Sequence, residues 1–495
     1  MALVPLTQRE LEHYLWEAAN ILRGPVDAAD FKTYIFPLLF FKRICDVYDE
    51  EFQGALAESG GDAVYASFAE QHHFIVPQGH HWKDVLEATE HRGVVLQRAL
   101  REIERANPNT LYGIFGDAQW SNTERFPDSL IAQLLDHFNR IRLGNAQVRE
   151  DQMGKAYEYL IKQFADVANK KAGEFYTPRT IVRLMVNILD PQPGESIYDP
   201  ACGTGGMLLE AVQHVREQGR EWRNLIIRGQ EKNLTTQSIA RMNLFLHGIE
   251  DFEIARGDTL RDPAFHRKDI LERFDCVIAN PPFSLSRWGS EAWSVDPYRR
   301  NLYGLPPESN GDYAWLLHML TSMHPDRGRM AVVLPHGTLF RGGKEGKIRL
   351  SLLRTGLLDA VIGLGSNLFY GTGIPAAILI FRARPDLPPD PVLFIDASEF
   401  YSKGRAQNLL TAEQADAIYD LYRQRNEVEG VARLVPLHKI LEEHDGNLNI
   451  ARYIQRQVKG EEVSVAVALE TLKARLDVQE QAEDRLWALI RREGF

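Results

Sequence analysis

The sequence predicts an α/β protein with a doubly wound, mostly parallel β-sheet. Three observations support this class: short apolar runs alternate with helical stretches after about residue 170, several runs are apolar throughout, and one leads directly into a glycine-rich turn. The chain has 495 residues, whereas ordinary domains have about 100–200. We therefore expect more than one domain.

Seven apolar runs are candidate strands. They are residues 196–199, 225–230, 252–255, 274–279, 329–334, 358–363 and 376–381. Several show no alternation of polar and apolar residues, so they suit strands that are buried on both faces of a parallel sheet. Helical patterns at residues 180–189 and 236–247 lie before and between them. The last two runs flank Gly371-Thr-Gly, which favours an antiparallel hairpin at the end of the sheet.

Changes of pattern divide the chain into three predicted domains. Residues 1–165 have apolar side chains at helical spacing, as at positions 11 to 22, and form a helical domain. Residues 166–400 hold the α/β pattern. Residues 401–495 are helical again and end in an apolar stripe within residues 469–490. Such a stripe fits a helix packed on its own domain or one docked on a partner, and we assign this region to partner docking.

Composition excludes several classes of protein. The 57 Lys and Arg residues against 68 Asp and Glu give a net charge of −11. This charge argues against a chain that coats nucleic acid through bulk charge, but it leaves room for a local basic groove. The three cysteines are far apart and no Cys/His spacing fits zinc, so we expect neither a disulfide scaffold nor a metal. The longest apolar run, residues 34–41, is too short to span a bilayer, and the N-terminus lacks a secretory pattern, so we expect a cytoplasmic protein without membrane segments.

The strongest local signal is Asp199-Pro-Ala-Cys-Gly-Thr-Gly-Gly-Met-Leu, between a predicted strand and a predicted helix. Gly203, Gly205 and Gly206 let the backbone turn tightly and approach a ligand without an intervening Cβ. The N–H groups at the helix start favour a negatively charged group, such as a carboxylate. No Gly-Lys-Ser/Thr follows, which excludes a phosphate-binding P-loop, and the spacing does not fit a dinucleotide fingerprint.

An acidic residue, Glu231, ends the next predicted strand. A carboxylate in this place can accept hydrogen bonds from both ribose hydroxyls of a nucleoside. Alone, Glu231 would be an ordinary solvated loop residue. Together with the glycine-rich turn, it predicts a nucleoside-binding site.

The second informative motif is Asn280-Pro-Pro-Phe, at the end of the predicted strand at residues 274–279. The two prolines fix an extended turn. The Asn280 side-chain oxygen and the Pro281 carbonyl can then accept hydrogen bonds from one amino group. Phe283 offers a flat face on which an extruded base can stack. The motif therefore predicts binding and alignment of an exocyclic amine.

Two weaker patterns fit more than one interpretation. His72-His73 and His80-His81 could suggest a metal, but loop histidines beside Trp82 are more often packing or solvent-exposed groups. Residues 287–304 mix tryptophan, tyrosine and arginine after the Asn-Pro-Pro-Phe turn. This segment fits a loop that closes over DNA or a flipped base, and equally an ordinary surface loop.

Taken together, the motifs resemble those of the S-adenosylmethionine-dependent amino-methyltransferases of the N6-adenine DNA class. The motifs of this class are the glycine-rich turn, Glu231, Gly257-Asp-Thr-Leu and Asn280-Pro-Pro-Phe. Three further segments are Gly173-Glu-Phe-Tyr-Thr-Pro-Arg, Asp312-Tyr-Ala-Trp and Asn447-Leu-Asn-Ile-Ala-Arg-Tyr-Ile. With them, the whole order is similar to the modification subunit of Type I restriction-modification systems, and the resemblance covers nearly the full chain.

The resemblance implies roles for the residues at matching positions. For the cofactor, it implies Glu174, Phe175, Tyr176, Thr177, Pro178 and Arg179 along the methionine end, Asp199, Gly203, Thr204, Gly205 and Gly206 around the amino-acid portion, Glu231 on the ribose and Asp258 on the adenine amine. For the target base, it implies Asn280, Pro281, Pro282 and Phe283 as the catalytic residues. Asp312 is expected in a helix that walls the cofactor pocket.

The resemblance also implies a Rossmann-like methyltransferase fold and a function. The domain at residues 166–400 would transfer a methyl group from S-adenosylmethionine to a flipped adenine in double-stranded DNA. A separate specificity subunit would choose the sequence, with two copies of this chain per specificity subunit and a restriction subunit in the full complex. The absence of an extra domain of target-recognition size between about residues 170 and 400 is consistent with this dependence.

The residues leave other functions open at this point. A free-standing adenine methyltransferase could read DNA through the helical domain, although the net charge of −11 makes this less attractive. Cytosine N4, a guanine in RNA or a glutamine side chain would need the same acceptors, while Phe283 and the flanking domains favour adenine in DNA. A cofactor-binding scaffold without catalysis and a dehydrogenase are alternatives of a different class.

Overall fold

The computed structural model describes residues 6–124, 126–168, 176–384, 391–405, 407–455 and 465–492. The chain forms two compact units, Met1–Ile454 and Gln455–Phe495. The second unit contains one helix, α16 (Val465–Arg492), whose described apolar side chains, such as Leu472 and Leu476, are exposed. Among the described residues, no helix is both long and apolar enough to cross a membrane.

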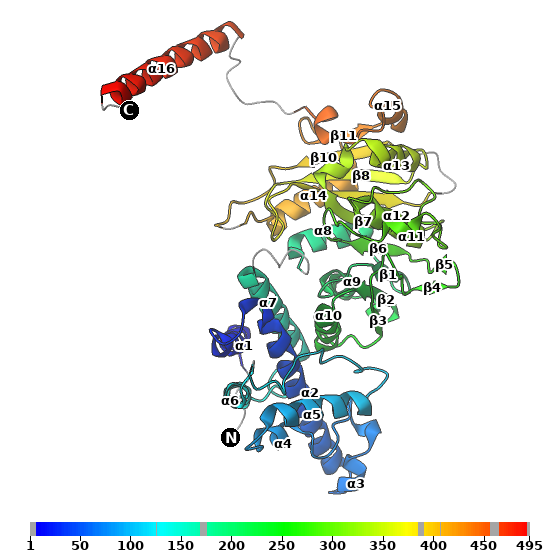
Figure 1. The fold of residues 1–495 in the computed structure, drawn as a ribbon. Coiled ribbons are helices and arrows are strands. Elements are labelled where there is room, and N and C mark those ends of the chain that lie inside the picture. The colour runs from blue at the N-terminus through cyan, green and yellow to red at the C-terminus, as the bar shows by residue number, and fades with distance from the viewer. Residues whose placement is uncertain are drawn as a thin grey trace. The chain divides into compact units, whose positions relative to one another are not determined.

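The first unit is organised around a large mixed sheet (Figure 1). Its strands are β1 (Ser196–Asp199), β2 (Ile226–Glu231), β3 (Phe252–Arg256), β6 (Cys276–Ala279), β7 (Arg329–Pro335), β8 (Leu358–Leu364), β9 (Ala376–Arg382), β10 (Val392–Ala397) and β11 (Ala432–Val435). Their order in the described part of the chain is β11-β10-β8-β9-β7-β6-β1-β2-β3. All neighbours pair in parallel except β9, which is antiparallel to β7 and β8, and β11, which is antiparallel to β10. A separate hairpin pairs β4 (His266–Arg267) with β5 (Ile270–Leu271).

The order of the strands reverses between β1 and β6. The chain runs outward from β1 to β2 and β3, and it then returns to β6 on the other side of β1 and continues to β7. The connections that follow β1 and β6 therefore leave the sheet side by side at one edge. Crevices at such reversal points are the usual ligand sites of open α/β sheets.

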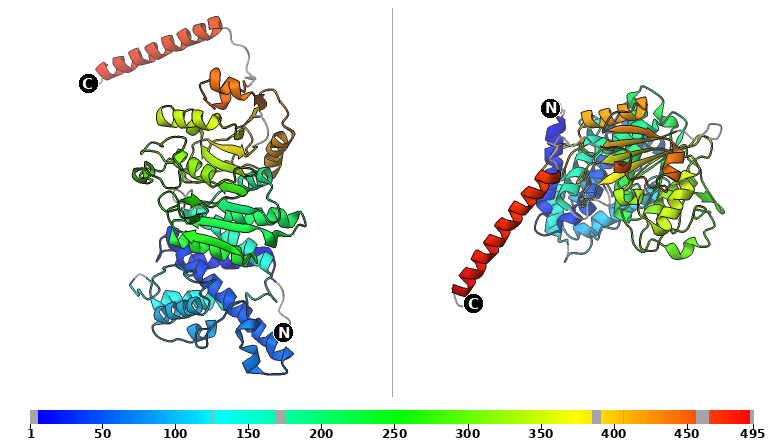
Figure 2. Two further views of the ribbon diagram at one scale, coloured as in Figure 1. Left: turned by 90° about the vertical axis from the view of Figure 1, so that its right-hand side faces the viewer. Right: turned by 90° about the horizontal axis from the view of Figure 1, so that it is seen from above.

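Helices cover both faces of the sheet (Figures 1 and 2). One face packs against α8 (Arg179–Leu189), α9 (Gly206–Glu217), α10 (Leu234–Leu246) and α14 (Ala412–Gln424). The other packs against α12 (Asp312–Ser322), α13 (Gly343–Leu353) and α15 (Leu437–Glu442). Since both faces are covered, β7 and β8 are buried at every residue, which explains their uniformly apolar sequences.

The N-terminal region is helical. It contains α1 (Gln8–Leu22), α2 (Phe31–Glu58), α3 (Ala63–Ala66), α4 (Trp82–Leu86), α5 (Arg92–Ala106), α6 (Asp128–Phe138) and α7 (Glu150–Ala168). Its apolar core also includes Ile239, Met242 and Leu246 of α10. Because α10 covers the sheet with its opposite side, this one helix joins the N-terminal helices to the sheet.

The predicted α/β class and mostly parallel sheet are confirmed, and so is the antiparallel pairing of β8 with β9. The sheet differs from the prediction in size, because β10 and β11 extend the seven predicted strands to nine in the described part of the chain. The β8–β9 hairpin is therefore not at the end of the sheet. The strand β11 lies in the region predicted to be helical, where Ala432–Val435 is too short to show a strand pattern. The boundaries near residues 165 and 400 stay a prediction.

Asp359 supports a prediction about stability. Its side chain, 2% exposed, accepts hydrogen bonds from Arg384 (2.7 Å), Arg425 (2.8 Å) and Tyr422 (2.6 Å). Asp359→Ala leaves three groups without their acceptor, and we expect the free energy of unfolding, measured with urea, to fall by about 3 kcal/mol. Asp420→Ala is the control, because Asp420 is an exposed partner of Arg423 on α14, the helix that also carries Tyr422. This change should lower the free energy of unfolding by less than about 1 kcal/mol. Equal effects of the two changes would contradict this account of the Asp359 cluster.

Candidate active site

The glycine-rich turn after β1 adopts the tight conformation that its sequence predicts. Gly203 (φ 54°) and Gly205 (φ 77°) lie in the left-handed region, where other residues are strained, and Gly205 caps α9. The Cys202 N–H donates to the Gln230 carbonyl oxygen at 3.1 Å, which ties the turn to β2. A Cβ on Gly205 would lie 3.4 Å from that of Ala240 on α10. The turn therefore lies closely between β2 and α10.

Glu231, at the end of β2, lies directly beside this turn. Its two carboxylate oxygens accept hydrogen bonds from the N–H groups of Gly203 (3.1 Å) and Asn233 (2.7 Å). Asp258 follows β3, and its carboxylate lies 3.0 Å from the Lys232 ammonium group. The structure thus brings both acids to the edge of the sheet that carries the turn.

Asp199, the last residue of β1, is buried beneath the turn. One of its oxygens accepts a hydrogen bond from the Ala201 N–H at 3.0 Å. Burial, with a smaller contribution from the nearby Glu231 carboxylate, raises the pKa of Asp199 to about 8. Asp199 therefore stabilises the turn through its backbone, and its side chain does not line the pocket beside the turn.

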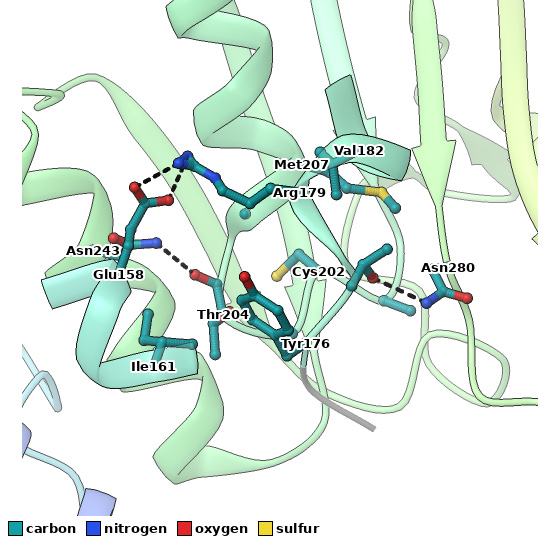
Figure 3. Close-up of a pocket in the computed structure, with 14 residues that line it drawn as sticks. Glu158, Ile161, Tyr176, Arg179, Val182, Cys202, Thr204, Met207, Asn243 and Asn280 are labelled. Carbon is teal, nitrogen blue, oxygen red and sulfur yellow. Dashed lines mark hydrogen bonds and ion pairs between the residues drawn. The ribbon is translucent and has the colours of Figure 1, made fainter. Parts of the chain in front are cut away.

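A pocket opens between the turn after β1 and the end of β6 (Figure 3). It is lined by Glu158, Ile161, Tyr176, Thr177, Arg179, Val182, Ala201, Cys202, Gly203, Thr204, Gly206, Met207, Asn243 and Asn280. The lining brings together the predicted residues Tyr176, Thr177 and Arg179, the turn and Asn280. Pro178 caps the start of α8. Glu174 and Phe175 lie outside the described residues.

Asn280 is held at the edge of this pocket with an acceptor available. Its amide nitrogen donates to the Thr177 hydroxyl at 2.9 Å, which fixes the orientation of the side chain. Its Oδ1 atom is buried and has no hydrogen-bond partner among the described residues. A buried polar atom of this kind normally has a partner, so the site fits a ligand that donates a hydrogen bond there.

Phe283 lies at the end of the same motif. Its ring packs against that of Phe369, with centroids 5.8 Å apart and planes inclined by 65°. Phe369 belongs to the connection between β8 and β9. It could not be found from the sequence, since a single aromatic residue in a loop without a recognisable motif gives no signal. Next to it, Tyr370 packs on Tyr176 and donates a hydrogen bond to Asp166 of α7.

Two further pocket residues, Glu158 and Asn243, were not found from the sequence. Glu158 of α7 binds the Arg179 guanidinium through both oxygens, at 2.6 and 2.8 Å (Figure 3). Asn243 of α10 donates to the Thr204 carbonyl at 3.0 Å, and its Oδ1 atom is also buried without a partner in the described part of the chain. Both lie on helices whose patterns show only amphipathic packing, so only the folded chain brings them to the pocket.

Asp312 does not wall the pocket as expected. It starts α12 and is fully buried, and one carboxylate oxygen accepts a hydrogen bond from the Ser284 N–H at 2.7 Å. The other oxygen is bound by Arg341. Its contacts are therefore with the turn that follows Phe283.

The two tryptophans of the segment at residues 287–304 are packed inside the protein. Trp288 and Trp293 are buried, and their indole N–H groups donate to the carbonyl oxygens of Pro307 and Leu260, each at 2.9 Å. Arg300 is also buried, where it pairs with Asp296. These three side chains therefore serve internal packing, whereas Tyr298 is partly exposed and Arg299 is exposed, so a contact of this segment with DNA stays a prediction.

The histidines of the N-terminal region do not form a metal site in this structure. His72 stacks on Tyr48 with ring centroids 3.8 Å apart, and it bonds the Ala66 carbonyl oxygen at 2.8 Å. Among the described residues, no group of three or more His, Cys, Asp or Glu side chains could hold a metal ion.

Comparisons with known proteins agree with this geometry. The family model for N-6 DNA Methylase matches residues 148–462, and that for the HsdM N-terminal domain matches residues 11–138. The chain is 31% identical to the Type I restriction enzyme MjaVII methylase subunit of Methanocaldococcus jannaschii, over 94% of this chain and 81% of the relative. It is 28% identical to the MpnII methylase subunit of Mycoplasma pneumoniae, over 97% and 95%.

A solved structure gives the same result. The type I restriction-modification system methyltransferase subunit of Streptococcus thermophilus is 31% identical to this chain, with a TM-score of 0.79. The similarity covers 91% of this chain and 100% of that one. The fold and the sequence therefore point to the same family.

Asp199 gives a prediction of pH dependence. Its pKa is raised to about 8, whereas an unfolded aspartate titrates near about 3.9. The folded chain thus keeps a proton that the unfolded chain loses, and this contribution to stability is lost as the pH rises through about 8. Asp199→Asn keeps an acceptor for Ala201 but cannot ionise. Between about pH 6 and about pH 8.5, the unfolding free energy should fall more steeply for the native chain than for this variant. Parallel urea-denaturation profiles would contradict the assignment.

Proposed function

The chain belongs to the N-6 DNA methylase family, as a Type I restriction enzyme methylase subunit, and we propose roles for its residues in the methylation of adenine. The protein is an adenine-specific DNA methyltransferase whose methyl donor is S-adenosylmethionine. It acts in a complex with specificity and restriction subunits and DNA. The observation that carries the proposed residue roles is the buried, unpartnered Oδ1 atom of Asn280.

The residues of the pocket fit S-adenosylmethionine. The turn at residues 203–206 leaves the start of α9 open to the amino-acid portion, and Tyr176, Thr177 and Arg179 line the same space. Glu231 ends β2, and Asp258 follows the adjacent strand β3. We assign Glu231 to the ribose hydroxyls and Asp258 to the adenine amine. The cofactor supplies a methyl group that its positively charged sulfur makes electrophilic.

Asn280 aligns the target amine. Thr177 accepts from the amide nitrogen, so the amide oxygen is directed to the ligand side, where it accepts a hydrogen bond from the adenine amino group. The Pro281 carbonyl accepts the second amine hydrogen. These two acceptors orient the nitrogen and stabilise the positive charge that develops on it. Pro282 keeps the turn extended, since its ring fixes the backbone.

The base is held by aromatic stacking. We assign Phe283 to one face of a flipped adenine, because a base inside the duplex cannot present its amine to Asn280. The Phe283 ring is in contact with the ring of Phe369. Entry of the base would separate these two rings.

Sequence choice comes from the specificity subunit. In the described part of the chain, the residues from β1 to β9 form strands of the sheet, helices that cover it and the small β4–β5 hairpin. The connections between these elements contain no domain of target-recognition size. The net charge of −11 further limits the affinity of the chain alone for DNA. We assign two copies of the chain to each specificity subunit, and we place the complex in the cytoplasm with its DNA substrate.

The proposal is tested by mass spectrometry of the methylated DNA. The purified chain, with and without its specificity subunit, is incubated with S-adenosylmethionine and DNA containing the recognition sequence. We expect N6-methyladenine only when the specificity subunit is present. Methylation by the chain alone would indicate a free-standing enzyme, and N4-methylcytosine as the product would refute adenine as the target.

The role of Asn280 predicts a separation of binding from catalysis. In the complex with the specificity subunit, Asn280→Ala should lower the methylation rate by about 100- to 1000-fold, because the amine loses an acceptor. The dissociation constant for S-adenosylmethionine should change little, as measured by calorimetry. Thr177→Val, which removes only the group that orients the amide, should have a smaller effect on the rate. Retained methylation in Asn280→Ala would refute the catalytic assignment and support a scaffold.

Glu158 predicts a contribution of the N-terminal region to cofactor binding. Glu158→Gln removes the nearer of the two carboxylates that pair with Arg179, since Glu210 lies 3.6 Å away, and it weakens the link between α7 and the pocket. We expect the affinity for S-adenosylmethionine to fall by about tenfold, which corresponds to about 1.4 kcal/mol. Glu217→Gln, an exposed position on α9, is the matched control and should leave the affinity unchanged. Equal affinities of Glu158→Gln and the native chain would show that this ion pair has no part in binding.

A further inference from the structure

The turn that follows the catalytic motif has an unusual backbone. Ser284 comes directly after Phe283 and has φ 52°, in the left-handed region that residues with a side chain seldom adopt. Such a conformation costs about 1 kcal/mol or more and persists only where surrounding groups enforce it. The structure shows those groups around Ser284.

The first of them is the carboxylate of Asp312. It accepts the Ser284 N–H at 2.7 Å from the start of α12, where its side chain is 1% exposed. A second bond joins the same segments, since the Gly311 N–H donates to the Leu285 carbonyl at 2.9 Å. Two hydrogen bonds therefore hold the turn at residues 284–285 against the start of α12, one at the Ser284 N–H and one at the Leu285 carbonyl.

The second is Arg341, which binds the other oxygen of Asp312. Its guanidinium also binds Glu345 of α13, which places it between the two carboxylates. The backbone of Arg341 is fixed as well, because the buried Arg349 donates to its carbonyl oxygen at 2.9 Å. The position of the Asp312 carboxylate is thus set from the side opposite Ser284.

These contacts form one connected path that ends at the peptide group between Phe283 and Ser284. Arg349 and Glu345 hold Arg341, Arg341 orients Asp312, and Asp312 holds the peptide that carries Phe283 on its other end. A shift of this peptide would move the Phe283 ring and the Pro281 carbonyl relative to Asn280. Displacements of about 1 Å in such alignments can cost about 100-fold in rate.

We propose that Asp312 is a positioning residue for adenine methylation, which fixes the turn after Asn280-Pro-Pro-Phe through Ser284 and is itself oriented by Arg341. Asp312 does not line the pocket and touches neither reactant, so it acts through Phe283. The proposal rests on the proposed function, because the turn it fixes is the one assigned to the base.

The test uses the complex with the specificity subunit and three variants: Asp312→Asn, Arg341→Ala and the double variant. Asparagine keeps an oxygen for Ser284 but offers Arg341 no charge. Each single variant should lower kcat by about 10- to 100-fold, whereas the dissociation constant for S-adenosylmethionine should stay within about twofold. Because the two side chains act as one unit, the double variant should be no slower than the slower single variant.

A spectroscopic measurement separates positioning from loss of folding. DNA with 2-aminopurine at the target adenine fluoresces when that base leaves the stack and loses its fluorescence gain when the base is poorly held. We expect a reduced gain for Asp312→Asn and Arg341→Ala. Glu195→Gln removes a carboxylate that pairs with Arg329 at the opposite edge of the sheet. This control should lower stability while leaving kcat and the fluorescence unchanged.

Three results would overturn the positioning role: an unchanged kcat in both single variants, multiplying losses in the double variant, or an equal loss of cofactor affinity. Arg341 is 30% exposed, so Arg341→Ala keeps the test available if Asp312→Asn does not fold. The two proposals fail separately. If Asn280→Ala abolishes methylation while Asp312→Asn and Arg341→Ala do not slow it, only the positioning role is wrong. If Asn280→Ala retains methylation, the proposed function is wrong.

Discussion

The parallel pairing of β1 with β6 places the two chemical motifs of this chain side by side. Ile197 and Tyr198 pair with Cys276 and Val277, so the glycine-rich turn and the Asn-Pro-Pro-Phe turn leave the sheet at the same edge. The Gly203 N–H then donates to Glu231, which holds the first turn, and the Asn280 amide donates to Thr177, which holds the second motif. A cofactor and an amine can meet there because these adjacent strands end together.

Much of this arrangement could be predicted from the sequence because it depends on local chemistry. Apolar runs identify strands that are buried on both faces, a cluster of glycines between a strand and a helix identifies the turn, and an Asn followed by two prolines identifies the acceptor pair. Glu158, Asn243 and Phe369 could not be found in this way. Each lies in an ordinary helix or loop and reaches the site only through long-range packing of α7, α10 or the β8–β9 connection.

The same residue types can serve packing or binding, and only the structure separates the two. Trp288, Trp293 and Arg300 suggested a loop that contacts DNA, yet their polar groups are satisfied inside the protein. Asp312 suggested a wall of the pocket, yet both its oxygens are bound to the loops around it. The net charge of −11 limits the affinity of this chain alone for DNA. This fits a chain in which few residues are assigned to the chemistry and a separate subunit selects the DNA sequence.

We expect the unpartnered oxygen of Asn280 to accept a hydrogen bond from the amine of an extruded adenine beside the cofactor pocket. A crystal structure of the complex with the specificity subunit, recognition-site DNA and S-adenosylhomocysteine tests it most directly. We expect the cofactor product between the turn at residues 203–206 and Thr177, with the target N6 atom within about 3 Å of Asn280 Oδ1. An adenine bound elsewhere would refute the role of Asn280, and a cofactor product outside this pocket would refute the assignment of the cofactor site.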